Sequence, residues 1–246
     1  DNEKKVILGG GNNILFVGDF DGVVIQPKIK GKQVVNKNKD VVIKVGASED
    51  WDSLVRWSVD KNWGGIENLI KIPGMVGGAV SQNIGAYGQE IADVVEKVAG
   101  INLDSGQEKV YTRDSCEFKY RSSVFKRELK NKFLITHVWF RLTPVTGEYQ
   151  PQYQYESLQK ELKGKPPYRL KQMMQAVASQ RLKNLPDINN YGTCGCFFTN
   201  PIVKKEKYEQ IKKKIQDLGC YPVSKGENWV KIPAGKLVEE RGWKGK

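Results

Sequence analysis

The stretch Ile72-Pro-Gly-Met-Val-Gly-Gly-Ala-Val-Ser-Gln-Asn-Ile-Gly-Ala-Tyr-Gly88 decides how this chain folds around a ligand. Its glycines crowd around two polar side chains, Gln82 and Asn83. Glycine has no Cβ and accepts positive φ, so the backbone here can approach a flat or anionic ligand closely. Amide side chains can satisfy the hydrogen-bonding edges of such a ligand. We therefore interpret the stretch as a ligand-binding loop.

A second glycine cluster, Gly9–Gly11, lies between two short apolar runs, Val6–Leu8 and Ile14–Val17. This pattern predicts strand, tight turn and strand. A Rossmann dinucleotide fingerprint requires a helix that opens at the glycine loop, and no helical pattern follows these glycines. Phosphate groups would instead have to meet the amides of the loop itself.

Composition sets limits on function. The chain has 246 residues, 39% of them hydrophobic, and a net charge of +12. Its length fits one large or two modest domains. The charge favours nucleic acid, an acidic membrane face or phosphorylated small molecules as partners. We find no zinc-finger spacing or aromatic RNA-binding signature.

The sequence also bears on location. No run approaches the ~18 apolar residues of a membrane span, and no leader is recognisable. We therefore expect a cytoplasmic protein without membrane contact.

The ends of the sequence suggest a piece of a longer protein. Asp1–Lys5 runs into an apolar strand without an initiator Met, and Gly242–Lys246 stops in what looks like mid-fold. We expect a fragment that lacks both ends.

Cysteine and histidine usage argues against a disulfide scaffold, a metal site and histidine-based catalysis. Four cysteines, Cys116, Cys194, Cys196 and Cys220, are too few and too irregular for a disulfide framework, and no second pair has zinc spacing. We expect reduced thiols. The single histidine, His137, lies in an apolar β-like run and is expected to be a partly buried strand residue.

The periodicity along the chain predicts an α+β protein. A first domain contains strands and a helix that starts at Ser48 as its N-cap and reaches the region of Lys61. A connecting or lid segment and a helix from Pro166 to about Lys183 follow, in which Met173 and Met174 are expected to pack in the core. An amphipathic helix carrying Tyr208, Ile211, Ile215 and Leu218 is expected to stop at Gly219. The predicted strands of the first domain are Val23–Ile25, Val41–Val45, Val94–Leu103, Lys109–Thr112 and Phe133–Leu142.

Two further motifs, Tyr120–Lys126 and Gly195–Pro201, complete a pattern that resembles the UDP-N-acetylenolpyruvoylglucosamine reductase family, the FAD enzymes of bacterial cell-wall precursor synthesis. Order and spacing agree from about Val6 to about Gly245. The resemblance implies an FAD-binding domain of PCMH type followed by a smaller α+β substrate-binding domain. We assign residues 1–143 to the first, 144–185 to the connecting or lid segment with its helix, and 186–246 to the second.

The resemblance also assigns the cofactor residues. FAD would be held by the first glycine turn and by the two halves of the glycine-rich stretch. The alternative is that the glycines serve only to form turns. That alternative accounts for any two of these segments but accounts poorly for all three. The matching residues are Gly9, Gly10, Gly11, Asn12, Asn13, Pro73, Gly74, Val76, Gly77, Gln82, Asn83, Gly85, Ala86 and Tyr87.

Two residues would carry the catalysis. Arg121 matches the catalytic arginine of the family, and a planar guanidinium is suited to gripping a carboxylate. Cys196 stands where the family has a proton-donating serine. A surface salt bridge for Arg121 and a buried inert thiol for Cys196 are the alternatives. A catalytic glutamate of the family is expected beyond Lys246, so the fragment is expected to be impaired.

The remaining assignments concern the substrate. Its predicted ligands are Tyr120, Tyr155, Lys183, Asn200 and Lys231. In the family a lysine stands where this chain has Asn184, so Lys183 would have to act from the neighbouring position.

The implied reaction uses NADPH as co-substrate and FAD as bound cofactor to convert UDP-N-acetylglucosamine enolpyruvate into UDP-N-acetylmuramate. We expect a monomer that binds neither nucleic acid nor metal. Another PCMH-type FAD oxidoreductase is the runner-up. A basic nucleic-acid-binding module is the rival from a different class, and it predicts no bound flavin and salt-sensitive binding of oligonucleotides.

Overall fold

The computed structural model describes residues 3–145, 155–185, 190, 194–195, 198–223 and 226–243. The chain divides into two compact units, Asp1–Cys194 and Gly195–Lys246. Each unit has its own hydrophobic core, and we describe each by itself.

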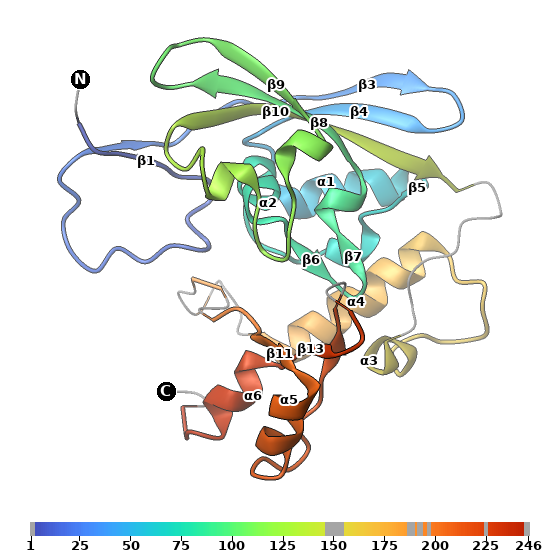
Figure 1. The fold of residues 1–246 in the computed structure, drawn as a ribbon. Helices are drawn as coiled ribbons and strands as arrows, with labels where there is room; N and C mark the ends of the chain where they lie inside the picture. The colour runs from blue at the N-terminus through green and yellow to red at the C-terminus, as the bar shows by residue number, and fades with distance from the viewer. Residues whose placement is uncertain are drawn as a thin grey trace. The chain divides into compact units, whose positions relative to one another are not determined.

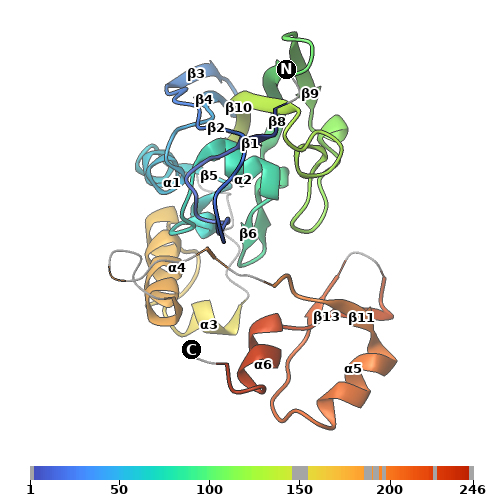
Figure 2. The ribbon, with the colours of Figure 1, turned by 90° about the vertical axis from the view of Figure 1, so that its left-hand side faces the viewer.

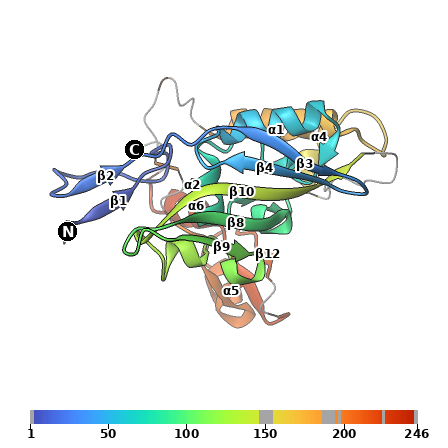
Figure 3. The same ribbon diagram turned by 90° about the horizontal axis from the view of Figure 1, so that it is seen from above.

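The first unit is built on a six-stranded sheet (Figures 1 and 3). Its order is β3-β4-β10-β8-β9, each neighbouring pair being antiparallel, and β5 pairs with the end of β10. The predictions of strands near β4, β8, β9 and β10 are confirmed. The strands are β3 (Lys32–Lys37), β4 (Val41–Gly46), β5 (Trp63–Gly64), β8 (Val95–Asn102), β9 (Glu108–Thr112) and β10 (Phe133–Pro144).

The central strand β10 shows why this sheet forms. Its side chains largely alternate, with Ile135, Val138, Phe140 and Leu142 buried and the residues between them more exposed. Alternation of this kind places one face of the sheet on the core. His137 lies in β10 and is half-buried, as expected from its sequence context.

Helices α1 (Trp51–Asp60) and α2 (Val76–Gln82) lie on one face of the sheet (Figure 1). Trp51 is fully buried, packs edge-on against Phe140 with ring centroids 6.0 Å apart, and donates its indole N–H to the carbonyl of Leu69. The one-turn helix η1 (Glu67–Leu69) follows α1 and β5.

Helix α4 (Leu170–Asn184) packs into the same core. Met173 and Met174 are buried there, which confirms their predicted role, and so are Leu170 and Val177. A short helix α3 (Glu156–Gln159) precedes it. None of the described helices has the length and apolar composition needed to cross a bilayer.

Shorter elements surround this core. Strands β1 (Lys5–Ile7) and β2 (Val23–Ile25) pair in parallel, and β6 (Gly85–Ala86) and β7 (Gln89–Glu90) form a small hairpin. Three one-turn helices complete the unit: η2 (Ile91–Asp93), η3 (Asp114–Cys116) and η4 (Val124–Lys126).

The second unit has a three-stranded sheet of order β11-β13-β12 and two helices (Figure 2). Its core contains Tyr208, Leu218, Val230 and Ile232. The elements are β11 (Ile202–Lys204), α5 (Lys205–Lys212), β12 (Tyr221–Pro222), β13 (Trp229–Lys231) and α6 (Ala234–Glu239).

Four local expectations are corrected. Ser48 does not cap α1: Asp50 does, accepting from the Ser53 amide at 2.8 Å. The Ser48 hydroxyl instead donates to the Pro27 carbonyl and accepts from the Ile29 amide. Residues 14–17 form no strand, because no neighbouring strand pairs with them, and Val17 is 95% exposed.

The other two corrections concern helices. The stretch 72–88 is not a continuous loop, because α2 and the β6–β7 hairpin form within it. Helix α5 ends at Lys212, before the predicted stop at Gly219, and turns follow it.

Candidate functional site

The two predicted glycine segments meet in the first unit. The turn at Gly9–Asn12 is anchored by Gln26, whose side-chain amide donates to the Gly9 carbonyl at 3.0 Å. A Cβ on Gly10 would lie 3.2 Å from the Cα of Gly74. This close backbone contact brings together segments more than sixty residues apart and favours glycine at position 10, whereas a φ of +128° favours glycine at position 74.

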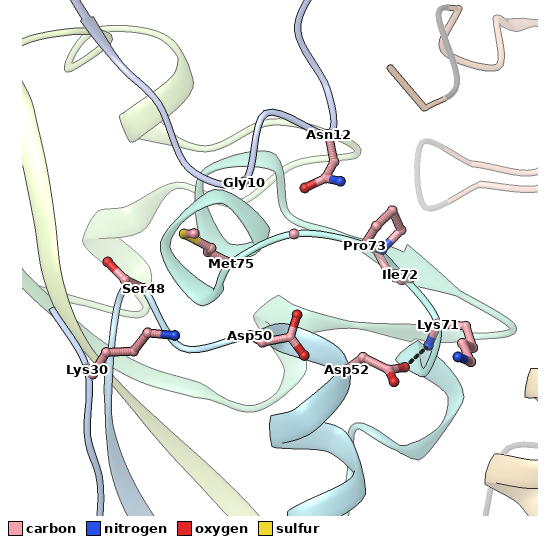
Figure 4. Close-up of a pocket in the computed structure, with 11 residues that line it drawn as sticks. Gly10, Asn12, Lys30, Ser48, Asp50, Asp52, Lys71, Ile72, Pro73 and Met75 are labelled. Atoms are coloured by element: carbon pink, nitrogen blue, oxygen red, sulfur yellow. Dashed lines mark hydrogen bonds between the residues drawn. The ribbon is translucent and has the colours of Figure 1, made fainter. Parts of the chain in front are cut away.

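A pocket of about 360 Å³ opens where these segments meet (Figure 4). Four of its lining residues belong to the predicted cofactor set, namely Gly10, Asn12, Pro73 and Gly74. The rest of the lining includes two lysines and two aspartates, Lys30, Lys71, Asp50 and Asp52. Both carboxylates also serve the protein, because Asp50 caps α1 and Asp52 accepts from the Lys71 amide at 2.7 Å. The site therefore combines glycine backbone with two ammonium groups and two carboxylates; of these, the glycine backbone and the ammonium groups are suited to a phosphorylated ligand.

Helix α2 is fixed beside this pocket by the backbone. The amide of Val76 donates to the Glu49 carbonyl and that of Gly77 to the Ala47 carbonyl, at 3.0 and 2.8 Å. A Cβ on Gly77 would lie 3.1 Å from the Cβ of Ala47, and Val76 is fully buried. Packing alone therefore explains why these two positions carry valine and glycine. Their contact with FAD stays a prediction.

The β6–β7 hairpin presents Tyr87. Tyr87 and Gly88 both have positive φ, +47° and +84°, as a type I′ turn requires. The side-chain amide of Asn68 donates to the Tyr87 carbonyl at 3.0 Å. The Tyr87 ring packs edge-on against Tyr155 with centroids 5.8 Å apart. The structure thus brings a predicted cofactor residue into contact with a predicted substrate residue.

Asn83 serves the protein interior. It is fully buried at the left-handed end of α2, with φ +46°. Its side-chain N–H groups donate to Glu90 and to the Lys119 carbonyl, and its oxygen accepts from the Ala92 amide. Sequence reasoning placed this side chain at a ligand edge, whereas the structure shows it joining three segments of the protein.

Arg121 lies in a tight turn closed by reciprocal hydrogen bonds between Lys119 and Ser122, both at 2.9 Å. Its φ is +54°, an uncommon conformation for a residue with a side chain. The guanidinium donates to the carbonyls of Asn83, at 3.2 Å, and Gly85, at 2.5 Å. The predicted catalytic arginine is therefore bound to the backbone of the predicted cofactor stretch.

Lys126 is a residue that sequence reasoning passed over. Its ammonium donates to Gln82 at 2.5 Å and to the Arg121 carbonyl at 3.1 Å. Burial lowers the pKa of Lys126, and the positive charges of Arg121 and Lys130 lower it further. Its position at the end of the Tyr120–Lys126 motif was the sequence feature that could have identified it.

The other predicted residues are placed as follows. Tyr120 lies against the Arg121 guanidinium, with its ring 5.1 Å from the Cζ atom. Lys183 pairs with Glu161 in the first unit. The hydrogen bonds from Lys183 and Ser179 lower the pKa of Glu161.

In the second unit, Asn200 accepts from the Ala234 amide at the start of α6, at 2.9 Å. The Lys231 ammonium lies 6.0 Å from the ring centroid of Tyr221. Cys196 lies outside the residues that the structure describes. Among those described, Cys116, Cys194 and Cys220 form no disulfide, and burial raises the pKa of the Cys116 thiol to about 12.

Comparison with known proteins identifies the family. A model described as FAD binding domain matches residues 1–109. The UDP-N-acetylenolpyruvoylglucosamine reductase of Flavobacterium johnsoniae is 42% identical over 248 residues, covering 100% of this chain and 72% of that protein. The enzyme of that name from Bacteroides fragilis is 38% identical, covering 97% of this chain and 70% of that protein.

The chain belongs to the UDP-N-acetylenolpyruvoylglucosamine reductase family. The crystal structure of such a reductase from Thermus caldophilus has the same fold, with a TM-score of 0.58, 22% identity, and coverage of 100% of this chain and 82% of that one. The predicted α+β class with an FAD-binding domain is confirmed.

Proposed function

We propose that this protein reduces the enolpyruvyl group of UDP-N-acetylglucosamine enolpyruvate to give UDP-N-acetylmuramate, with FAD as bound cofactor and NADPH as electron donor. As the family resemblance implies, it would act in the cytoplasm, as a monomer, in peptidoglycan precursor synthesis. The observation that carries the proposal is the attachment of Arg121, from the substrate-side motif, to the carbonyls of Asn83 and Gly85 in the cofactor stretch.

The residues of the first unit suit FAD. The Gly9–Asn13 turn and the Pro73–Gly77 segment would hold the cofactor, since glycine backbone lines their pocket. Lys30 and Lys71 would face the phosphates, and Asp50 and Asp52 balance their charge. Tyr87 would contact it from the β6–β7 turn. When bound, FAD supplies the hydride chemistry that no side chain can provide.

Arg121 supplies charge. Two of the five N–H donors of a guanidinium are engaged by Asn83 and Gly85. The others would bind the substrate carboxylate and stabilise the negative charge that develops on it as the double bond accepts hydride. Because the guanidinium is already held by these two carbonyls, it needs little reorganisation to bind the substrate carboxylate.

Cys196 would complete the reaction by donating its thiol proton to the carbon next to the carboxylate. Hydride on one carbon and a proton on the other convert the double bond into a single bond. A thiol, with an ordinary pKa near about 8.5, gives up a proton more readily than the serine hydroxyl of the family.

The domain assignment accompanies this proposal: residues 1–143 would bind FAD, 144–185 would connect or close the site, and 186–246 would bind the UDP-sugar. Tyr155, packed on Tyr87, supports a closing role for the middle segment.

The visible absorption spectrum of the purified protein, extended to the full length of its relatives, tests the proposal, since this chain covers 72% of the Flavobacterium johnsoniae enzyme. We expect a stoichiometric flavin band that bleaches with NADPH and returns when the enolpyruvyl UDP-sugar is added. A band that bleaches but does not return would favour another FAD oxidoreductase. Failure to bind FAD, together with salt-sensitive binding of oligonucleotides, would favour the nucleic-acid-binding alternative.

The Cys196→Ala substitution tests the proton donor. We expect flavin reoxidation by the enolpyruvyl substrate to slow by about 10²- to 10⁴-fold, while reduction by NADPH is nearly unchanged, because only reoxidation needs this proton. Stopped-flow absorbance separates the two steps. Cys194→Ala, two residues away, is the matched control. Equal losses in both steps would exclude the proton-donor role.

A further inference from the structure

Two segments of the first unit are fastened together beside Arg121. The buried Ser123 hydroxyl donates to the Ser81 carbonyl at 2.7 Å, and the buried Asn83 amide donates to the Lys119 carbonyl at 2.9 Å. Residues 119–126 and 81–85 are thus held together by side chains from both sides. Arg121 projects from one of these segments onto the other.

The main chain at Arg121 needs support. A residue with a side chain at positive φ, here +54°, lies in a sparsely populated region and persists there only when its surroundings hold it. The Lys119–Ser122 hydrogen bonds hold the turn from outside. The carbonyl of Arg121 itself accepts from the Lys126 ammonium at 3.1 Å.

Lys126 also holds the opposite segment. The same ammonium donates to the Gln82 side chain at 2.5 Å, so one cation bridges the Arg121 carbonyl and the end of α2. The charged groups around it are the Arg121 guanidinium and Lys130, both positive. Placing an ammonium beside a guanidinium is unfavourable, so the two hydrogen bonds and the packing of η4 must offset the repulsion.

We propose that Lys126 is a positioning residue of the reductase reaction, which acts by fixing the Arg121 turn so that the guanidinium stays on the Asn83 and Gly85 carbonyls. The inference rests on the proposed function, because it takes Arg121 as the group that binds the substrate carboxylate. The sequence motif contains Lys126 but assigns it no role.

Kinetics of three variants test the role. For Lys126→Met we expect unchanged NADPH reduction of the FAD-saturated protein, and reoxidation by the enolpyruvyl UDP-sugar slower by about 10- to 100-fold, because a small displacement of a catalytic group has an effect of this size. FAD affinity is measured separately, since Lys126 also holds Gln82, a predicted cofactor residue. Lys126→Arg should recover most of the rate, because a guanidinium can donate to both partners. Lys130→Met, at a neighbouring lysine that is exposed as Lys126 is, should change the rate less than about twofold.

A second measurement needs no ligand and no activity. In the Nη–Hη NMR spectrum of arginine-labelled protein, with the Arg121 signal assigned by its loss in Arg121→Lys, we expect a resolved and slowly exchanging signal, because both Nη atoms donate to backbone carbonyls. Lys126→Met should broaden or shift this signal, and Lys130→Met should leave it in place.

The two measurements separate the inference from the proposed function. If Lys126→Met matches Lys130→Met in both rate and NMR signal, the positioning role is wrong while the reductase assignment stands. If the wild-type protein, extended to the full length of its relatives, binds FAD but does not reduce the enolpyruvyl UDP-sugar, the proposed function is wrong, and with it the reaction in which Lys126 was given a role. A loss of rate that Lys126→Arg does not recover would also overturn the bridging role.

Discussion

Arg121 has a structural role in the turn that it occupies, beside the chemical role proposed for it. Its backbone adopts a left-handed turn, and its side chain binds carbonyls of a segment almost forty residues earlier in the sequence. Arginine suits this position because its planar fork can donate to protein and ligand at once, whereas a lysine ammonium acts as a single point of charge.

His137 gives the molecule a predictable response to pH. Burial lowers the pKa of His137, Lys44 lowers it further, and Glu108 opposes the shift. The unfolded chain therefore takes up a proton near pH ~6.5 that the folded protein binds only at lower pH. Since the unfolded state then binds more protons, we expect the free energy of unfolding to fall as the pH drops below about 6.5 and to level off below the pKa of the folded state.

This expectation is checked by urea unfolding between about pH 7.5 and pH 5.5, comparing the wild type with His137→Gln. Because the sequence contains a single histidine, the difference between the two curves isolates its contribution. Curves that stay parallel over this range would contradict it.

At the scale of elements, the start of α1 is set by Asp50 and not by Ser48. We expect Asp50→Ala to lower the free energy of unfolding by about 0.5–2 kcal/mol, because the amide of Ser53 loses its acceptor and the helix N-terminus loses a negative charge.

Asp60→Ala at the other end of α1 is the matched control. Asp60 is exposed at the C-terminal end, where a negative charge is unfavourable, so its removal should cost less than about 0.5 kcal/mol or stabilise slightly. Equal losses for the two variants in chemical denaturation would show that Asp50 does not act as a cap.

The elements that sequence reasoning located share a local signal. β4 and β10 are rich in β-branched and aromatic residues, and their partners lie in the same sheet. Residues 14–17 have the same kind of composition but form no strand, because pairing depends on a neighbour that no local pattern specifies. Helix α2 was missed for the opposite reason: Gly77 and Gly78 disfavour a helix, and backbone hydrogen bonds to Ala47 and Glu49 hold its start.

The residues of the candidate site also divide into those that could be predicted from the sequence and those that could not. The glycine segments and Arg121 could be found because their residue types match a family motif. The bridging role of Lys126 and the interior role of Asn83 could not, because each depends on contacts between residues far apart in sequence, Lys126 with Gln82 and Asn83 with Lys119. Spacing along the chain carries no information about such contacts.

At the scale of the molecule, the two units differ greatly in the core they bury. The first combines the face of a six-stranded sheet with α1, α2 and α4, whereas the core of the second centres on Tyr208, Leu218, Val230 and Ile232. All the residues assigned to FAD lie in the first unit. FAD binding should therefore depend on the folding of the first unit and not of the second.

This asymmetry predicts how the chain can be cut. We expect a fragment of residues 1–194 to fold and to bind FAD. A fragment ending at residue 143 should be much less stable, because it loses α4 and with it the buried side chains of Leu170, Met173 and Val177, each of which contributes about 1.5–3 kcal/mol. Residues 195–246 alone should not fold, because a core this small rarely supplies more than about 3–5 kcal/mol.

Circular dichroism and flavin fluorescence quenching of the three fragments check these expectations. Leu170→Ala in the 1–194 fragment separates the packing of α4 from the length of the chain: the variant should lose stability by about 2–5 kcal/mol while FAD still binds under folding conditions. A 1–143 fragment as stable as 1–194 would show that α4 is dispensable for the core, and the cofactor domain would then end where the sequence alone placed it. A stable 195–246 fragment would mean that its fold has a source of stability other than the small core.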